Sequence, residues 1–295
     1  MKNLPSRLCI VAHYDKDSKI DEYVKYYVEQ LEKVCNKIIL VSVSNLSDDE
    51  IKKIKSPITS VINRENVGYD FYSYKVGLES INCENYNEIL ICNDSVYGPL
   101  IDIELIFDKM KDSKADFWGI TSSNSLNFHI QSYFIVFRKQ IIMNEIFKQF
   151  WKNLKVLDNK EDIIKSCEVG LSQLLYKNNF KSDTYVKDLK LELKKSDNFK
   201  SLITKLLKSP LKIFKLFLRP KQYINALNRK DNNPSLSSIK KQIVENRPFL
   251  KVSMFTKDSD KNTNLNFVIN KLKLHFNYNS NLITKHCLRI LRIDK

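Results

Sequence analysis

The sequence predicts an α/β fold around a mostly parallel central sheet, and two observations carry this prediction. Over the first 190 residues, short apolar runs rich in β-branched residues alternate with longer segments whose apolar residues recur at helical spacing. Only 5 glycines and 7 prolines occur in 295 residues, which argues against a turn-rich all-β architecture. Strands that alternate with helices are joined by right-handed crossovers, and such crossovers place the strands parallel.

The predicted strands are short, apolar and bounded by polar residues. They are Arg7–Tyr14, Lys37–Ser44, Ile58–Ile62, Glu88–Cys92, Asp116–Thr121 and Gln131–Phe137. The predicted helices show an apolar face, and one of them starts with a Ser followed by three acids, a typical helix N-terminus. They are Ile20–Val34, Ser47–Lys55, Asp70–Ile81, Ile103–Met110, Ile141–Asn153 and Glu161–Lys177.

Charge divides the chain into two regions. Residues 1–190 carry 26 basic and 27 acidic side chains, whereas residues 191–295 carry 23 basic and 7 acidic ones. We therefore expect a catalytic or binding domain over 1–190 and a basic, mainly helical region over 191–295 that completes the fold near 233–256. The six cysteines contain no CxxC pair, and the four histidines show no zinc-ligand spacing.

Within the basic region, Asn198–Lys230 has nine Lys or Arg residues, no acid, and many interleaved Leu, Ile and Phe residues. A basic amphipathic segment is typical of contact with an anionic membrane surface. A bundle helix that packs its apolar face on the main domain explains the same pattern equally well. No apolar run is long enough to span a bilayer and no signal peptide is evident, so we expect a cytoplasmic protein, peripheral at the inner face of the membrane.

Polar residues follow three of the predicted strands. His13, Tyr14 and Asp15 follow the first, Asn63–Asn66 the third, and Asn93–Ser95 the fourth. Ligands of parallel sheets bind beyond the carboxyl ends of the strands, so these residues are candidates for a binding site.

The segment Arg64–Lys75 (RENVGYDFYSYK) is the strongest of these signals. It joins a strand to a helix, where backbone amides and the helix dipole favour an anion. Gly68 allows a tight turn, while Asn66 and Asp70 offer donors and acceptors to a ligand. An ordinary strand–turn–helix connection with Asp70 as helix cap accounts for the segment about as well.

The segment Ile91–Leu100 (ICNDSVYGPL) places one carboxylate, Asp94, directly after a buried strand. A carboxylate held there can coordinate Mg²⁺ or Mn²⁺ that bridges a diphosphate. Asn93 and Ser95 are weaker ligands. The alternative is a plain turn closed by Gly98 and Pro99.

Six blocks in order resemble the rhamnan synthesis protein F family, putative glycosyltransferases of polysaccharide assembly. The blocks are NVGYDFYSYK, NDSVYGPL, DFWGIT, HIQSYFIVF, CEVGLSQLL and NPSL…RPFLKVSMF, and they cover roughly residues 6–256. The resemblance implies a GT-A-like fold, a nucleoside-diphosphate sugar donor and, as one candidate, dTDP-L-rhamnose. It also implies that Asn93-Asp94-Ser95 stands where GT-A enzymes keep an Asp-x-Asp metal motif. Because this motif has one acid instead of two, the need for a divalent cation is open, and Arg64 or Lys75 is the alternative counter-charge for the diphosphate.

The same resemblance suggests roles for residues later in the chain. An inverting transfer needs a base for the acceptor hydroxyl, for which Glu168 is the first candidate and His129 the second. A helix-surface or structural hydrogen-bonding role fits Glu168 somewhat better, and His129 is equally a candidate contact of the acceptor sugar. The acceptor sugar is expected to contact Trp118, Gln131, Tyr133 and Lys251, although the two aromatic residues fit the core better. His13, Tyr14 and Asp15 are expected to hold the nucleoside.

The function predicted from these observations is transfer of a sugar from a nucleotide donor to a lipid-linked glycan of a cell-surface polysaccharide. The alternative is a non-catalytic scaffold or polyanion-binding protein with a basic tail. No RNA- or DNA-binding motif is present, so we expect no specific nucleic acid partner.

Overall fold

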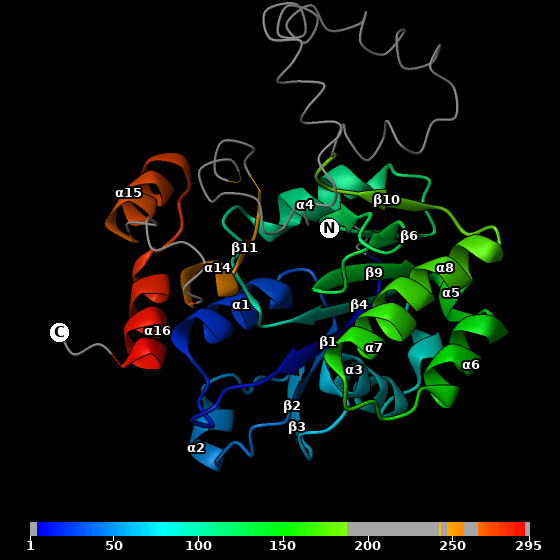
Figure 1. Ribbon diagram of the computed structural model, residues 1–295, viewed down its shortest axis with the longest axis horizontal. Coiled ribbons are helices and arrows are strands. Elements are labelled where there is room, and N and C mark those ends of the chain that lie inside the picture. Colours follow the sequence, from blue (N-terminus) through cyan, green and yellow to red (C-terminus); the bar gives the residue numbers. More distant parts are fainter. Residues whose placement is uncertain (1–4, 188–241, 243–246, 257–264, 293–295) are drawn as a thin grey trace, which may run out of the picture.

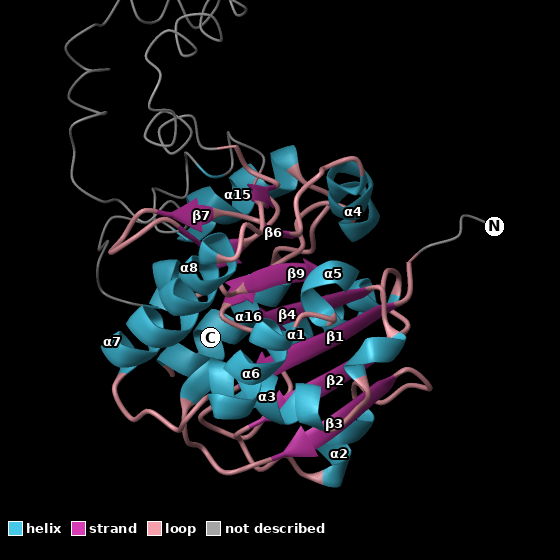
Figure 2. Cartoon of the chain, turned by 90° about the vertical axis from the view of Figure 1, so that its right-hand side faces the viewer, coloured by secondary structure: helices cyan, strands magenta, loops and turns pink. Residues whose placement is uncertain are grey.

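The computed structural model describes residues 5–187, 242, 247–256 and 265–292, and its centre is a seven-stranded sheet. The strand order is β10-β6-β9-β4-β1-β2-β3, and Figure 2 shows most of these strands side by side. The strands are β1 (Arg7–His13), β2 (Lys37–Ser42), β3 (Thr59–Asn63), β4 (Glu88–Asn93), β6 (Phe117–Gly119), β9 (Phe134–Arg138) and β10 (Ser182–Thr184).

All strands of this sheet run in one direction except β9, which is antiparallel to both β4 and β6. The predicted α/β fold with a mostly parallel sheet is therefore confirmed. The exception has a topological cause. Between β6 and β9 lies only the short pair β7 (Ser122–Ser123) and β8 (His129–Ile130), with no helix to carry the chain back to the other end of the sheet.

Helices cover both faces of the sheet (Figure 1). One face packs against α1 (Glu22–Glu32), α2 (Asp48–Lys52), α4 (Ile103–Lys111), α14 (Ser253–Thr256), α15 (Leu265–His275) and α16 (Asn281–Leu291). The other packs against α3 (Tyr69–Glu79), α5 (Lys139–Ile142), α6 (Glu145–Asn153), α7 (Lys160–Ile163) and α8 (Gly170–Lys177). Strand residues serve the two faces alternately: Cys9 and Val11 pack in the first core, Leu8 and Ile10 in the second.

Two predicted helices are interrupted. Asn144 separates α5 from α6 because its side chain accepts a hydrogen bond from the Ile146 amide at 2.9 Å and so caps a new helix. The predicted helix Glu161–Lys177 contains a π-helical stretch, Ile164–Val169, between α7 and α8. A short 3-10 helix, Cys83–Asn85, precedes β4.

The distal part of the chain returns to the sheet edge where the predicted site lies. β11 (Leu250–Lys251) pairs antiparallel with β5 (Val96–Tyr97), directly after β4, and α16 lies along α1. The boundary at residue 190 and the basic segment Asn198–Lys230 fall outside the described residues, so both stay predictions. Among the helices that the structure describes, none has the length and apolar character needed to cross a bilayer.

Candidate functional site

A pocket of about 450 Å³ lies where the direction of strand addition in the sheet reverses. From β1 the chain proceeds to β2 and β3 on one side and then crosses to β4 on the other. This reversal leaves a crevice beyond the carboxyl ends of β1 and β4, the usual ligand position in open α/β sheets. The pocket is lined by His13, Tyr14, Val43, Asn66, Val67, Gly68, Tyr69, Asp70, Ser73 and Asp158.

One wall of the pocket is the N-terminus of α3. Gly68 caps this helix with φ of +67°, and a Cβ at this position would lie 2.7 Å from the Cβ of Tyr72. Only glycine adopts this conformation here without strain. The cap brings Tyr69 and Asp70 into the pocket wall at the positive end of the helix dipole, which favours an anionic ligand.

The Arg64 guanidinium holds this turn together from inside. Its five N–H groups donate to the carbonyl oxygens of Glu65, Val67 and Tyr69 and twice to Ser73 Oγ, at 2.6–3.1 Å. No donor is left for a diphosphate. The expectation that Arg64 neutralises the donor is thereby corrected: it shapes the turn that lines the pocket.

Lys75 also has a structural role. Its Nζ donates to the carbonyl oxygens of Trp151 and Lys152 at 2.8 and 2.7 Å, and it pairs with Glu79 at 3.3 Å. It caps the C-terminus of α6, and it is absent from the pocket lining. Lys75 is therefore not the expected counter-charge of a bound diphosphate.

A chain of hydrogen bonds connects four of the predicted site residues. Asn93 Nδ2 donates to Asp70 Oδ2 at 2.7 Å, and Asn93 Oδ1 accepts from Ser95 Oγ at 2.6 Å. Lys251 Nζ donates to Ser95 Oγ at 3.1 Å and lies 4.3 Å from the ring centre of Tyr133. Residues from α3, β4 and β11, far apart in the sequence, thus form one polar network.

Asp94 lies on the other side of this network. Its Oδ2 accepts from the Tyr14 amide at 2.9 Å and lies 3.9 Å from His13 Nε2. The carboxylate is therefore held between the ends of β1 and β4, beside the pocket. His13 Nδ1 is 2.9 Å from Ser42 Oγ at the end of β2, which fixes the ring.

The electrostatics of the site favour the binding of a cation. Burial raises the pKa of Asp94 well above its usual value and also raises that of Asp70, although the Asn93 amide opposes the latter. Burial lowers the pKa of Lys251 to about 8, against the attraction of Glu168 and Asp70. Burial also lowers the pKa of His13 to about 4, so its imidazole is neutral near pH 7. Burial thus favours the neutral carboxyl at both acids, and a nearby cation is what stabilises the ionised form.

A divalent cation fits this site on the evidence of one atom. Nε2 of His13 is buried, has no hydrogen-bond partner among the described residues, and lies beside the Asp94 carboxylate. A buried polar atom without a partner is costly and rare, and a neutral imidazole next to a carboxylate is a common donor set for metals.

Glu168 lies on the π-helical stretch, close enough for its charge to act on Asp70 and Lys251. Its Oε1 accepts from the amide and hydroxyl of Ser132, at 2.7 and 3.0 Å. Tyr74 in turn donates to the Ser132 carbonyl at 3.1 Å. Glu168 is thus held by Ser132 near Asp70 and Lys251, and it is not part of the pocket lining.

The other residues expected on the acceptor side are buried. His129 is 3% exposed and its Nδ1 contacts the Asn127 carbonyl oxygen at 2.8 Å. Gln131 and Tyr133 both hydrogen-bond the hydroxyl of Thr121, at 2.7 and 2.8 Å. All three lie within the protein rather than on an open face.

Trp118 is a core residue. It is 1% exposed and packs against Phe107 and Phe134 with ring centres 5.2 and 5.9 Å away. No face of the indole is open to a sugar, so the stacking role is corrected in favour of the core alternative.

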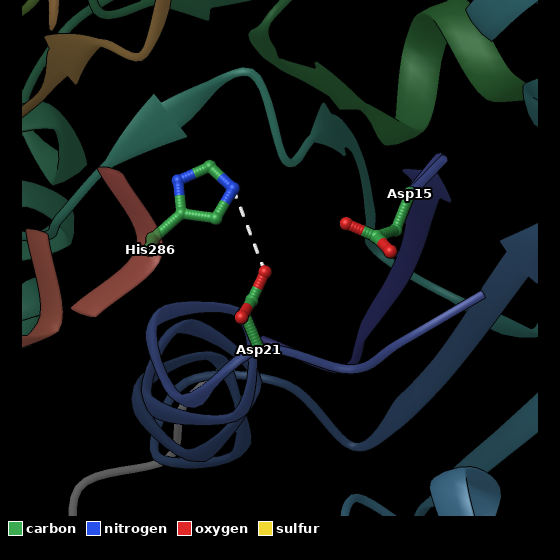
Figure 3. A group of neighbouring side chains, drawn as sticks. All are labelled: Asp15, Asp21 and His286. Carbon is green, nitrogen blue, oxygen red and sulfur yellow. Dashed lines mark ion pairs between the residues drawn. The ribbon is translucent and has the colours of Figure 1, made fainter. Parts of the chain in front are cut away.

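Asp15 does not face the pocket. With Asp21 and His286 it forms a cluster whose ligand atoms lie within 4.8 Å of one another, drawn in Figure 3. The guanidinium of Arg289, on α16, makes ion pairs with Asp15, Asp17 and Asp21. The cluster is therefore an ion-pair group that holds α16 against the loop between β1 and α1. Asp15 is consequently not available to hold a nucleoside.

Of the other expected donor contacts, Tyr14 and Asn66 are exposed and line the pocket. Sequence reasoning missed Tyr69, Ser73 and Asp158. The first two belong to the RENVGYDFYSYK segment, so their position next to Asp70 was a usable signal. Asp158 lies in the loop before α7 and has no local signal.

The comparison with protein families gives the clearest identification. The sequence profile described as rhamnan synthesis protein F matches residues 38–216, more than half of the chain. The chain belongs to the rhamnan synthesis protein F family. The match includes the whole Arg64–Lys75 segment, the Asn93–Ser95 turn and Glu168.

Individual relatives match a smaller part of the chain than the family profile does. The chain is 27% identical over 154 residues to the uncharacterized protein y4gN of Sinorhizobium fredii, a match over 49% of this chain and 40% of the relative. It is 35% identical over 116 residues to the virulence protein VirA of Vibrio anguillarum, over 37% of this chain and 36% of the relative. The matched region thus spans well under half the length of these curated relatives.

Solved structures give weak alignments. The 4-diphosphocytidyl-2C-methyl-D-erythritol synthase of Anaerococcus prevotii aligns with a TM-score of 0.41 and 13% identity, over 61% of this chain and 86% of that one. The inositol-1-phosphate CTP transferase of T. maritima aligns with a TM-score of 0.39 and 12% identity, over the same shares of the two chains. Because these TM-scores lie below 0.5, the proposals below depend on the family and the site alone.

Proposed function

We propose that this protein is a glycosyltransferase of the GT-A type that transfers a sugar from a nucleoside-diphosphate donor during assembly of a polysaccharide. The observation that carries the proposal is the convergence of Asp70, Asn93, Asp94 and Lys251 at the reversal point of the sheet, beside a pocket of about 450 Å³. Membership of the rhamnan synthesis protein F family supports polysaccharide synthesis as the setting.

The pocket has suitable partners for an activated sugar. Its outer part, with the exposed Tyr14 and Asn66, offers an aromatic face and an amide for the nucleoside. Its inner part, at the N-terminus of α3, suits the diphosphate because the helix dipole attracts negative charge there. Lys251 supplies a half-buried cation near Asp70.

Glu168 is our candidate for the base. As the acceptor hydroxyl attacks the anomeric carbon, the bond to the diphosphate oxygen breaks and the hydroxyl proton passes to the Glu168 carboxylate. The hydrogen bonds from Ser132 fix the orientation of this carboxylate. Negative charge that develops on the leaving diphosphate is stabilised by Lys251 and the α3 amides.

A bound divalent cation would add further charge stabilisation at the diphosphate, with Asp94 as a ligand. L-Rhamnose as the transferred sugar, dTDP as the nucleotide and a lipid-linked glycan at the membrane surface as the acceptor are the finer parts of the proposal. The family description suggests the sugar and its nucleotide, and the basic region of the chain suggests the membrane-bound acceptor.

Calorimetric titration with a panel of nucleotide sugars, with and without Mn²⁺, tests the proposal. We expect at least one to bind, and Asp94→Asn or Asp70→Asn to weaken it by at least about tenfold, ~1.4 kcal/mol. Asp112→Asn, at the exposed end of α4, is the matched control and should bind normally. If no nucleotide sugar binds while duplex DNA binds in a salt-sensitive manner, the polyanion-binding alternative is favoured instead.

A further inference from the structure

One polar atom of the site, in the side chain of His13, is buried without a hydrogen-bond partner among the described residues. The residue is 2% exposed, and its Nδ1 lies 2.9 Å from Ser42 Oγ. Its Nε2 is buried and has no hydrogen-bond partner among the described residues, and the residue is one of those that line the pocket. The atom is therefore desolvated and unsatisfied.

The surroundings of Ser42 indicate which form His13 takes. Ser42 Oγ lies 3.1 Å from the Ser44 amide, which can only donate, so the hydroxyl oxygen accepts there. An Nδ1–H that donates to the same oxygen is consistent with this pattern. In that tautomer Nε2 presents a lone pair.

This lone pair lies 3.9 Å from Oδ2 of Asp94, an oxygen that also accepts from the Tyr14 amide. When Asp94 is ionised, an imidazole lone pair and a carboxylate oxygen lie close together in a desolvated place. A cation between them satisfies both. Ligand nitrogen and oxygen atoms lie about 2.1 Å from such an ion, so two ligands of one ion can be up to ~4.2 Å apart, and the observed separation fits.

We propose that His13 Nε2 and the Asp94 carboxylate together hold a divalent transition-metal cation of the Mn²⁺ class, with His13 in place of a second acid. An imidazole ligand favours transition metals over Mg²⁺ and Ca²⁺, which prefer oxygen ligands. The remaining coordination positions go to water and to the diphosphate, and this last step rests on the proposed function.

Ser42 is a positioning residue in this proposal. A hydrogen bond on the second ring nitrogen of a histidine ligand fixes its tautomer and orientation, and loss of such a partner costs roughly 10–100-fold in metal affinity. The Asp15–Asp21–His286 cluster is not a competing site, because Arg289 already supplies the positive charge there.

Pulsed EPR of the wild-type protein with Mn²⁺ tests the inference, first with the metal alone and then with UDP or dTDP added. We expect one bound Mn²⁺ whose echo is modulated by a nitrogen nucleus, and ¹⁵N-histidine labelling should change that modulation. Mn²⁺ bound without nitrogen coupling overturns the inference, as does a failure to bind Mn²⁺ under both conditions.

Variants assign the nitrogen. His13→Asn should lose the nitrogen modulation and bind Mn²⁺ at least tenfold more weakly, whereas His275→Asn, exposed on α15, should keep both. Ser42→Ala should retain the fold and weaken Mn²⁺ roughly 10–100-fold. Nitrogen modulation that persists in a folded His13→Asn protein overturns the assignment.

The two proposals fail in different ways. Nucleotide-sugar binding that needs Asp70 but is unaffected by Mn²⁺ overturns the metal site and leaves the transferase. Mn²⁺ bound by His13 without any nucleotide-sugar affinity supports the metal site and overturns the transferase.

Discussion

At the scale of single residues, the site combines desolvated acids with one titratable cation. Lys251 reaches Ser95 from a distant part of the chain, and burial lowers its pKa to about 8. Its positive charge is thus present at pH 7 and is lost at moderately alkaline pH, unlike that of an exposed lysine. The affinity for an anionic ligand that pairs with this lysine should therefore fall as the lysine loses its charge.

We therefore predict that nucleoside diphosphate affinity falls as pH rises above about 8, by up to tenfold per pH unit. The affinity falls rather than rises because Lys251 is deprotonated in the free protein above this pH. The lysine must then take up a proton before it can pair with the anion. Lys251→Arg should keep the affinity up to pH 9.5, and Lys251→Met should bind weakly throughout. Titrations from pH 6.5 to 9.5 measure this, with the exposed Lys52→Met as control. A wild-type profile that is flat over this range would exclude Lys251 from the anion site.

The residue scale also shows where sequence reasoning stops. The Gly68 turn and Asp94 were identifiable because each directly follows a strand of predictable position. The roles of Arg64 and Lys75 could not be identified in this way. The sequence does not show whether a cation near a predicted anion site donates to a ligand or to backbone carbonyl groups. Only the fold shows that their donors are occupied.

At the scale of elements, the strands and helices of the first half lie close to their predicted positions, since their periodicity is strong. Two features were not predictable in this way. The antiparallel β9 depends on a connection without a helix, and the pairing of β5 with β11 joins residues that are distant in the sequence. Local periodicity does not encode such long-range pairing.

The pairing of β5 with β11 depends on Gly98. Its φ is +140°, and a Cβ there would lie 2.6 Å from the Pro248 carbonyl oxygen and 2.7 Å from the Phe249 ring. We predict that Gly98→Ala destabilises the protein by about 2–3 kcal/mol and displaces Lys251, so that donor affinity also falls.

Chemical denaturation and ligand titration of the same sample test this prediction. Gly170→Ala is the matched control: its Cβ would meet only the Lys165 carbonyl oxygen at 3.4 Å, in a helix that favours alanine over glycine. It should be neutral or slightly more stable. Equal stability of the two variants would mean that the 247–251 segment does not press against Gly98.

At the scale of the whole molecule, ion pairs hold α16 against the loop between β1 and α1. Arg289 on α16 pairs with Asp15, Asp17 and Asp21, and His286 lies 3.5 Å from Asp21. Burial acts to raise the pKa of Asp15, but hydrogen bonds from Arg289 and two backbone amides outweigh it, so the pKa is lowered. The loop that α16 holds leads directly into Tyr14 and His13 at the site.

We predict that Arg289→Ala lowers the free energy of unfolding by about 2 kcal/mol at pH 7, because three carboxylates then lie close together without a cation. A carboxyl with a lowered pKa stabilises the fold above its unfolded-state pKa and loses that contribution as pH falls. The difference between variant and wild type should therefore shrink from pH 7 toward pH 3. Lys285→Ala, exposed on the same helix, should show no difference. A stability difference between Arg289→Ala and the wild type that stays constant with pH would show that packing of α16, and not this ion-pair group, holds the loop.

The central claim concerns the whole molecule as well: the crevice beyond β1 and β4 binds an activated sugar. A crystal structure of the protein with a bound nucleotide sugar and Mn²⁺ tests it most directly. We predict that the diphosphate lies between the Gly68–Asp70 turn and Asp94, with the nucleoside toward Tyr14. A nucleotide sugar bound elsewhere on the protein, with this pocket filled only by solvent, would contradict the account.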